Sequence, residues 1–230
     1  MHIVIFGANG QTGRLLTRQA LDAGHSVVAV TRQPTAFPFA DPALIVAGAD
    51  VRKAETIVDV VAGADAALST LGVPFTRDAV DTYSVGTANI VGAMNTAGVR
   101  RLVVVSSSGA FPAAGRTGAP IALRFFEPVI TKTIGKTVYD DMRRMETIVR
   151  DSGLDWTIVR PSGLFDSPYV TDYRAGEADP VGAFTSRSDL AHYLVRLASR
   201  SGRGETVSIS TTADTPTMWQ MIRREAFKSA

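Results

Sequence analysis

Three glycines near the N-terminus have a spacing that suits phosphate binding. Gly7, Gly10 and Gly13 follow an apolar run over residues 2–6 and open a segment with helical periodicity. A dinucleotide site needs small residues here, because the chain turns tightly, the backbone approaches a pyrophosphate and the helix packs near the sheet. The helix N-terminus then presents its free N–H groups to the phosphate. A glycine turn without a ligand is the alternative. The cofactor contacts expected from this loop are Gly7, Asn9, Gly10, Gln11, Thr12 and Gly13.

The second expected strand, residues 26–31, ends without the carboxylate that is typical of NAD sites. Such a site usually has an acidic residue about 20 positions after the loop, where it holds the ribose hydroxyls. Here Thr31 and Arg32 occupy that place, and Arg14 lies just inside the first helix. A guanidinium can pair with a 2′-phosphate, so the pattern predicts NADP(H) in preference to NAD(H). The alternative is that both arginines are solvated surface residues.

Short β-branched runs alternate along the chain with longer segments of helical periodicity. Strands are expected over residues 2–6, 26–31, 43–47, 65–70, 101–106, 156–160 and 206–210. Helices are expected over residues 11–23, 52–61, 78–97, 138–152, 187–199 and 216–227. Strands as apolar as 101–106 are typical of parallel sheets that are buried on both faces. The alternation therefore predicts an α/β fold, a Rossmann-type doubly wound parallel sheet with helices on both faces.

The chain shows no internal repeat or linker, so we expect one NAD(P)-binding domain over residues 1–230. Two regions rich in Gly, Ala and Pro interrupt the pattern, at about 109–135 and 162–183. Both follow expected strands, and ligands of open α/β sheets bind beyond the carboxyl ends of strands. These loops are the expected substrate walls, the second forming a small region toward the C-terminus.

Composition excludes several classes of function. The chain has no cysteine, which rules out a disulfide framework, a thiol nucleophile and a cysteine zinc site. The three histidines are isolated in sequence, so no metal site is expected. The net charge is +2 with scattered basic residues, which does not favour nucleic acid. No apolar run reaches the roughly 20 residues of a membrane helix. We expect a cytoplasmic protein with a small-molecule substrate, and the sequence does not indicate its oligomeric state.

Further motifs occur in the order of a known family. They are GANGQTGR at 7–14, GADV at 48–51, STLG at 69–72, GVRRLVVVSS at 98–107 and WTIVRP at 156–161. With these motifs the sequence resembles an atypical short-chain dehydrogenase/reductase of the NAD(P)H-binding group, which includes NmrA-like and flavin/biliverdin reductase-like proteins. The resemblance implies adenine contacts, a wall near the adenine ribose and pyrophosphate, and contacts around the nicotinamide. The implied adenine contacts are Asp50 and Val51, and the implied wall near the ribose and pyrophosphate is Thr70, Leu71 and Gly72. The implied contacts around the nicotinamide are Ser106, Ser107 and Pro161.

The resemblance also implies a catalytic Ser, Tyr and Lys, with the tyrosine and lysine four apart on one helical face. Ser107 stands at a suitable place, and Tyr139 is followed four residues later by Arg143. In the family the lysine precedes a glutamate by four, and counting back from Glu146 gives Met142. The tyrosine is thus one residue late, a rotation of about 100° that turns it away from the nicotinamide. Ser107 and Tyr139 are the candidate catalytic residues, with a merely packing Tyr139 as the alternative.

Two functions follow from these observations. The first is an NADP(H)-dependent oxidoreductase that reduces a small acceptor such as a quinone, a flavin or a carbonyl compound. Hydride transfer chiefly needs the nicotinamide held against an electrophile, since the cofactor carries the hard chemistry. The alternative is a non-catalytic, NAD(P)-sensing regulatory binding protein, as some NmrA-like relatives are. We favour the enzyme.

Overall fold

The protein is described here by a computed structural model, which covers residues 1–111, 135–176, 182–201 and 204–217. Its strands are β1 His2–Phe6, β2 Ser26–Thr31, β3 Leu44–Gly48, β4 Ala66–Ser69, β5 Arg101–Val105, β6 Asp155–Pro161, β7 Gly163–Phe165, β8 Tyr173–Gly176, β9 Phe184–Ser186 and β10 Glu205–Thr211. Its α-helices are α1 Gln11–Asp22, α2 Val58–Val61, α3 Thr82–Ala97, α5 Lys136–Arg150 and α6 Arg187–Ala198. Single 3₁₀ turns are η1 Pro34–Ala36, η2 Ala54–Thr56 and η3 Ser108–Ala110.

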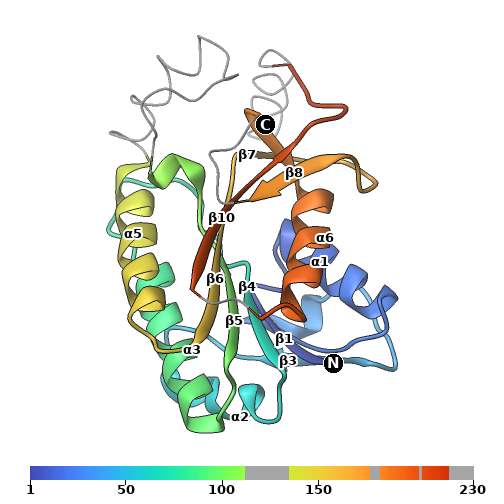
Figure 1. The fold of residues 1–230 in the computed structure, drawn as a ribbon. Helices are drawn as coiled ribbons and strands as arrows, with labels where there is room; N and C mark the ends of the chain where they lie inside the picture. The colour runs from blue at the N-terminus through green and yellow to red at the C-terminus, as the bar shows by residue number, and fades with distance from the viewer. Residues whose placement is uncertain (112–134, 177–181, 202–203, 218–230) are drawn as a thin grey trace.

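One large sheet carries the fold, in the strand order β3-β2-β1-β4-β5-β6-β10-β8 (Figure 1). All neighbouring strands run parallel except the edge strand β8, which is antiparallel to β10. The chain winds outward from β1 to β3, then returns beside β1 with β4 and winds the other way. This reversal places a topological switch point between β1 and β4, where ligands of such sheets bind. The predicted Rossmann-type doubly wound sheet is confirmed.

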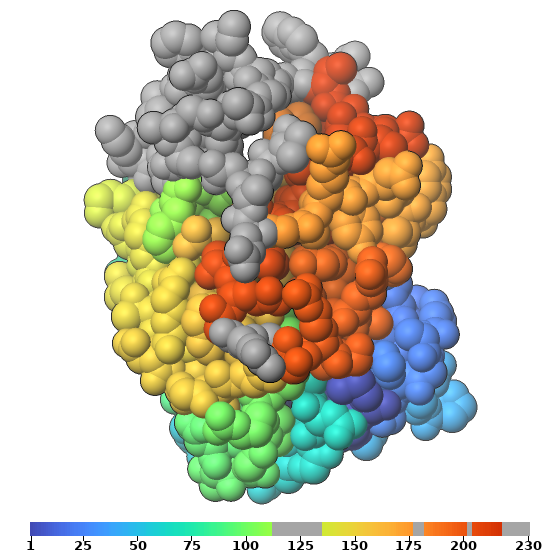
Figure 2. Space-filling view, viewed as in Figure 1, coloured from blue at the N-terminus to red at the C-terminus, as the bar shows by residue number. Residues whose placement is uncertain are grey.

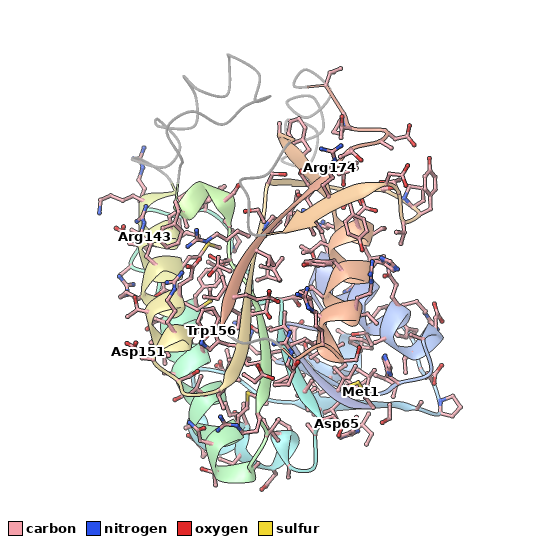
Figure 3. All side chains as sticks on the ribbon, viewed as in Figure 1. Met1, Asp65, Arg143, Asp151, Trp156 and Arg174 are labelled. Carbon is pink, nitrogen blue, oxygen red and sulfur yellow. The ribbon has the colours of Figure 1, made fainter. Side chains whose placement is uncertain are left out.

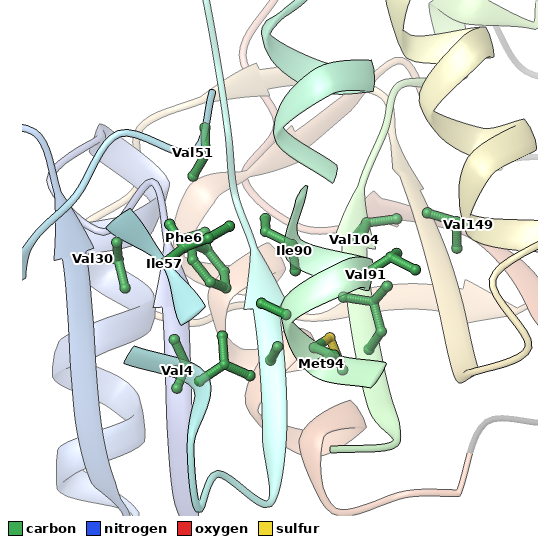
Figure 4. Close-up of a cluster of buried hydrophobic side chains, with 14 of the residues drawn as sticks. Val4, Phe6, Val30, Val51, Ile57, Ile90, Val91, Met94, Val104 and Val149 are labelled. Atoms are coloured by element: carbon green, nitrogen blue, oxygen red, sulfur yellow. The ribbon is translucent and has the colours of Figure 1, made fainter. Parts of the chain in front are cut away.

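Helices cover both faces of the sheet because alternate side chains of each strand point to opposite faces. In β1, Val4 and Phe6 pack into the core beneath α3 and α5, whereas Ile3 and Ile5 pack against α1 and α6. Figure 4 shows the first of these two cores, with Phe6 among Val30, Ile57 and Ile90. The strands are buried on both faces, which explains why their sequences are almost continuously apolar.

The space-filling view shows how the layers reach the surface. The helix α5 (yellow) and the orange-to-red segments of α6 and β10 lie side by side on the face in view (Figure 2). The N-terminal residues (blue) emerge on the side opposite α5. Among the described residues, no helix is both long enough and apolar enough to cross a membrane.

The predicted helix over residues 52–61 is wrong. The structure has only η2 and the four-residue α2 there. The hydroxyl of Thr56 donates to the Lys53 carbonyl at 2.8 Å and accepts from the Asp50 N–H at 3.2 Å. Such side-chain bonds to nearby backbone compete with a regular helix. Elsewhere α3 begins at Thr82 rather than 78, and α5 begins at Lys136 rather than 138.

The region expected as a loop over residues 162–183 contains β7 and β8. β7 pairs with β9 in a separate two-stranded parallel sheet, and β8 extends the main sheet beyond β10. These strands have three and four residues, too few for a periodic pattern to be visible in the sequence. Residues 112–134, within the other expected loop, and residues 218–230, which include most of the helix expected over 216–227, lie outside the described residues.

A buried carboxylate on α5 holds the start of α3. Asp141 is fully buried and accepts from the backbone N–H groups of Tyr83 at 2.8 Å and Ser84 at 3.3 Å. It also accepts from the Ser84 hydroxyl and from Arg144 Nη2 at 3.0 Å. The residue at the N-cap of α3, Asp81, makes no side-chain cap bond, so Asp141 satisfies these amides from a neighbouring helix.

We predict that Asp141→Ala lowers the free energy of unfolding by about 2–3 kcal/mol, because it leaves buried N–H groups without an acceptor. Urea unfolding followed by circular dichroism measures the change. Asp140→Ala is the matched control, since Asp140 makes exposed ion pairs with Lys136 and Arg143 and its loss costs less than about 1 kcal/mol. Equal destabilisation by both variants would contradict the role given to Asp141.

Candidate functional site

A crevice of about 1150 Å³ runs along the edge where the parallel strands end. It is larger than the roughly 300–1,000 Å³ typical of small-molecule sites, and so leaves room for a dinucleotide and an acceptor. The sequence-predicted residues that line it are Gly7, Asn9, Gly10, Gln11, Thr12, Thr31, Arg32, Asp50, Val51, Thr70, Leu71, Gly72, Ser106, Ser107, Tyr139 and Pro161. Gly13 and Arg14 are the predicted residues outside this lining.

Two of the loop glycines are required by close packing. Gly7 has a φ of +75°, and a Cβ there would lie 2.7 Å from the carbonyl oxygen of Thr70 at the end of β4. A Cβ at Gly13 would lie 2.2 Å from the carbonyl oxygen of Gly7. Gly7 therefore lets β1 pass closely beside β4, and Gly13 lets α1 pack onto the loop. Gly13 is buried and acts through this packing rather than by lining the crevice.

The start of α1 has the properties of a phosphate site. Gly10 is its N-cap, no side chain caps the helix, and its first turn has no acidic residue. The first N–H groups of a helix have no partner within it, and their partial positive charge favours an anion. Gly10 is exposed, and a Cβ there would meet only the Gly7 carbonyl oxygen, at 3.2 Å. The loop therefore presents open backbone donors to the crevice, which fits a pyrophosphate.

The end of the crevice formed after β2 and β3 carries charged side chains. Arg32 is exposed and lines the crevice directly after β2. The Thr31 hydroxyl accepts from the Gln33 N–H at 3.2 Å, so it shapes the turn that presents Arg32. Arg14 instead donates from Nε to Asn9 Oδ1 at 2.9 Å. Arg32 is thus the arginine placed at the crevice, while Arg14 braces the loop.

Beside Arg32, Asp50 and Val51 form the wall of the crevice that follows β3. Asp50 Oδ1 accepts from the Arg52 N–H at 3.1 Å, which closes a turn, and the Val51 carbonyl accepts from Asn89 Nδ2 at 2.9 Å. Gly86 of α3 lies against Val51, since a Cβ there would be 2.8 Å from a Val51 methyl group. Val51 therefore gives this wall an apolar surface that α3 supports closely from behind, as a flat base would require.

The other end of the crevice is lined by hydroxyls that follow β5. The side chain of Ser106 is buried, and its Oγ has no hydrogen-bond partner within the described part of the chain. Buried polar atoms in proteins nearly always have a partner, so this hydroxyl fits an additional polar group in the crevice. The Ser107 hydroxyl accepts from the Gly109 N–H at 3.1 Å and keeps its own proton to donate. These two serines fit a nicotinamide and its acceptor.

Tyr139 lines the same end of the crevice. Its ring lies 5.7 Å from that of Phe75, and its hydroxyl borders Gly109, where a Cβ would be 2.8 Å away. The one-residue offset does not turn it out of the crevice. Val138, its neighbour, is the residue buried in the core, and Tyr139 lies in the first turn of α5, where that helix reaches the edge of the sheet.

Arg143 does not take the place of a catalytic lysine. Its Nε donates to the Ala110 carbonyl at 2.8 Å, and its Nη1 pairs with Asp140 Oδ1 at 2.5 Å. It is labelled on α5 in Figure 3 and does not line the crevice. The orientation of α5 is set instead by Glu146, which is fully buried and accepts two hydrogen bonds from Arg160, at 2.9 and 2.6 Å.

Phe75 and Arg187 are among the lining residues that were not identified from the sequence. Phe75 follows β4 in an irregular segment and is 53% exposed. Its place after a strand was the available signal, because residues at carboxyl ends of strands meet at one edge. Arg187 opens α6, and its approach to the crevice depends on how β9 delivers the chain to that helix. No local pattern encodes that approach.

Two tyrosines in the segment that follows β6 lie outside the crevice lining. Tyr169 is 59% exposed and, like Tyr173, does not line the crevice. The Tyr173 hydroxyl lies 2.8 Å from His192 Nδ1. Both Asp189 carboxylate oxygens accept hydrogen bonds from Thr171 and Thr211. Within the described residues, no group of three or more His, Asp or Glu could hold a metal ion.

Comparisons with known proteins agree with this geometry. The chain is 32% identical over 180 residues, 72% of its length, to the uncharacterized chloroplastic protein At2g34460 of Arabidopsis thaliana. It spans about 60% of that relative and 15% of the mycobacterial relative Rv2047c.

Two solved structures are similar in fold. The oxidoreductase ylbE of Lactococcus lactis has a TM-score of 0.77 and 19% identity, covering 100% of this chain and 96% of its own. A short-chain dehydrogenase/reductase of Veillonella parvula in complex with NADP has a TM-score of 0.75 and 21% identity, covering 94% and 99%.

The family comparison decides the assignment. A family model described as NAD(P)H-binding matches residues 7–201, which include the phosphate loop and the strands whose ends form the crevice. The match extends through α6 and therefore includes the hydroxyl-lined end of the crevice as well as its phosphate end. The sequence motifs, the sheet order and the similar structures agree with it. The chain therefore belongs to the NAD(P)H-binding family.

Proposed function

We propose that this protein is an NADP(H)-dependent oxidoreductase that reduces a small planar acceptor, such as a quinone, a flavin or a carbonyl compound. The observation that carries the proposal is the continuity of the crevice. It extends from Arg32 past the phosphate loop to Ser107, Tyr139 and Phe75, so a dinucleotide and an acceptor fit end to end. A site for the nucleotide alone would not need the end of the crevice that Ser107, Tyr139 and Phe75 line.

The residues at the far end supply binding and a proton. When bound, the reduced nicotinamide supplies a hydride, which together with one proton converts a carbonyl to an alcohol or a quinone to a hydroquinone. Phe75 and Tyr139 present aromatic faces against which a planar acceptor can stack. The hydroxyls of Ser107 and Tyr139 donate hydrogen bonds to the acceptor oxygen, and Tyr139 passes it the proton. The carbon that receives the hydride then needs no further group from the protein.

Cofactor preference rests on Arg32. It is the first charged residue after β2, is exposed, and has no carboxylate beside it on that strand end. A guanidinium binds a phosphate through paired charge-assisted hydrogen bonds. An NAD-preferring site would place an acid there for the ribose hydroxyls, so we propose NADP(H) in preference to NAD(H).

One observation favours the second function, a regulatory protein that senses the redox state of the nucleotide. Arg143, which follows Tyr139 by four residues as a catalytic lysine would, is occupied by Asp140 and the Ala110 carbonyl outside the crevice. The two functions separate in one comparison. NADPH oxidation with a panel of quinones, flavins and carbonyl compounds supports the enzyme. No turnover, together with a protein partner that binds differently with NADP⁺ and with NADPH, supports the sensor.

We predict that Arg32→Ala raises the Kd for NADPH roughly ten- to hundredfold and leaves the Kd for NADH unchanged, because one charge-assisted phosphate contact is lost. Titration by nicotinamide fluorescence measures both constants. Arg174→Ala removes another exposed arginine, which is labelled in Figure 3 and lies on β8 outside the crevice lining, and should change neither. An equal effect of Arg32→Ala on both nucleotides would contradict the preference for NADP(H).

We also predict that Tyr139→Phe lowers kcat for a carbonyl acceptor roughly 100- to 10,000-fold, because the proton donor is lost while the aromatic wall remains. The Kd for NADPH should be unchanged. Ser107→Ala should lower kcat in the same direction, since it removes a hydrogen bond to the acceptor oxygen. Steady-state kinetics measure these effects, with the exposed Tyr169→Phe as control. An unchanged kcat for Tyr139→Phe would leave this tyrosine a packing role alone.

A further inference from the structure

The charged residues that line the crevice are unevenly distributed. Within the described part of the chain, Arg32, Asp50 and Arg52 lie at the end formed after β2 and β3, and Arg187 is the charged residue at the opposite end. No carboxylate of the described residues lines that opposite end. We propose that Arg187 binds an anionic group of the acceptor, a carboxylate or sulfonate, and so selects acidic substrates. This inference rests on the reductase function proposed above.

The present partner of Arg187 can be exchanged. Its Nη1 lies 2.8 Å from Asp166 Oδ1, and the side chains are 15% and 57% exposed. An ion pair with so exposed a carboxylate contributes little free energy, because water competes for it. The guanidinium has five N–H donors in a planar fork, and the hydrogen bond to Asp166 Oδ1 comes from Nη1. An incoming carboxylate can therefore bind beside Asp166 or replace it.

The fold of α6 does not explain a positive charge at this place. Arg187 is the first residue of the helix, where a cation is opposed by the helix dipole. The backbone N–H of Asp189, in the first turn of α6, already donates to Ser186 Oγ at 3.0 Å. The Asp189 carboxylate, the acid of the first turn, accepts from Thr171 and Thr211 and leaves Arg187 without compensation from it. The charge of Arg187 is therefore compensated by the exposed Asp166 and not by the first turn of α6.

The surroundings of Arg187 suit a flat molecule with one charged edge. Gly163, Gly182 and Ala183 line this end with little side-chain volume, and Leu164 and Phe184 add apolar surface. The opposing wall carries Phe75 and Tyr139. An acceptor with an aromatic body and an acidic substituent would satisfy both the apolar surface and the guanidinium.

The test uses a matched pair of probes, 1,4-naphthoquinone-2-sulfonate and neutral 1,4-naphthoquinone, with wild type, Arg187→Gln and Asp166→Asn. We expect Arg187→Gln to raise KM for the sulfonate roughly ten- to hundredfold and to leave KM for the neutral quinone unchanged. Asp166→Asn should lower KM for the sulfonate roughly two- to fivefold, because it removes a competing anion. A purely structural ion pair would make both variants change both probes in the same direction.

Two binding measurements make the outcome decisive. NADPH titration by fluorescence should give the same Kd for wild type and Arg187→Gln. A weakened NADPH affinity would assign Arg187 to a cofactor phosphate and overturn the inference. Calorimetric titration of the sulfonate into the NADP⁺ complex should show tighter binding than the neutral quinone, and equal binding would also overturn it. If the inference about Arg187 fails, turnover of the neutral quinone still supports the proposed reductase function. If the sulfonate binds but neither quinone is turned over, the reductase function is contradicted and the anion site remains supported.

Discussion

The close approach of the chain at the switch point is the constraint on which the site depends. The backbone of Gly7 lies against the Thr70 carbonyl, and Gly13 lies against the Gly7 carbonyl, at distances that exclude any Cβ. β1, β4 and α1 can meet only because two residues there have no side chain. The same contact leaves the uncapped start of α1 open to the crevice. Packing and phosphate binding therefore have one structural cause.

The second half of the crevice depends on buried charge rather than on glycine. Asp141 ties α5 to the start of α3, and Glu146 ties α5 to Arg160 of β6. Both carboxylates are fully buried, and each is satisfied by several donors. Removing one partner of such a pair is costly, so the orientation of α5 is closely determined. That orientation brings Tyr139 beside Phe75 and Gly109, and so builds the aromatic wall.

The charged groups also differ between the phosphate-loop end of the crevice and its opposite end. The end with the phosphate loop has backbone dipoles, the exposed Arg32 and Arg52, and Asp50, whereas the opposite end has apolar walls, hydroxyls and Arg187. Arrangements of this kind separate binding of the cofactor from recognition of the acceptor, because each end can change without altering the other. A family that shares the first end can therefore act on different molecules at the second, and fold alone does not name the substrate.

The sequence by itself determined the sheet, the phosphate loop and the residues that follow each strand, because glycine spacing and strand periodicity are local properties. It did not determine where Tyr139 points. On an ideal helix a one-residue offset turns the side chain away, whereas Asp141 and Glu146 set the actual orientation of α5. The sequence also missed β7, β8 and β9, which are too short to show a period, and it predicted over 52–61 a longer helix than the structure has, because side-chain bonds of Thr56 interrupt it. Phe75 and Arg187 reach the crevice through the tertiary fold, because contacts between distant segments are set by packing and buried polar pairs rather than by neighbours in the chain.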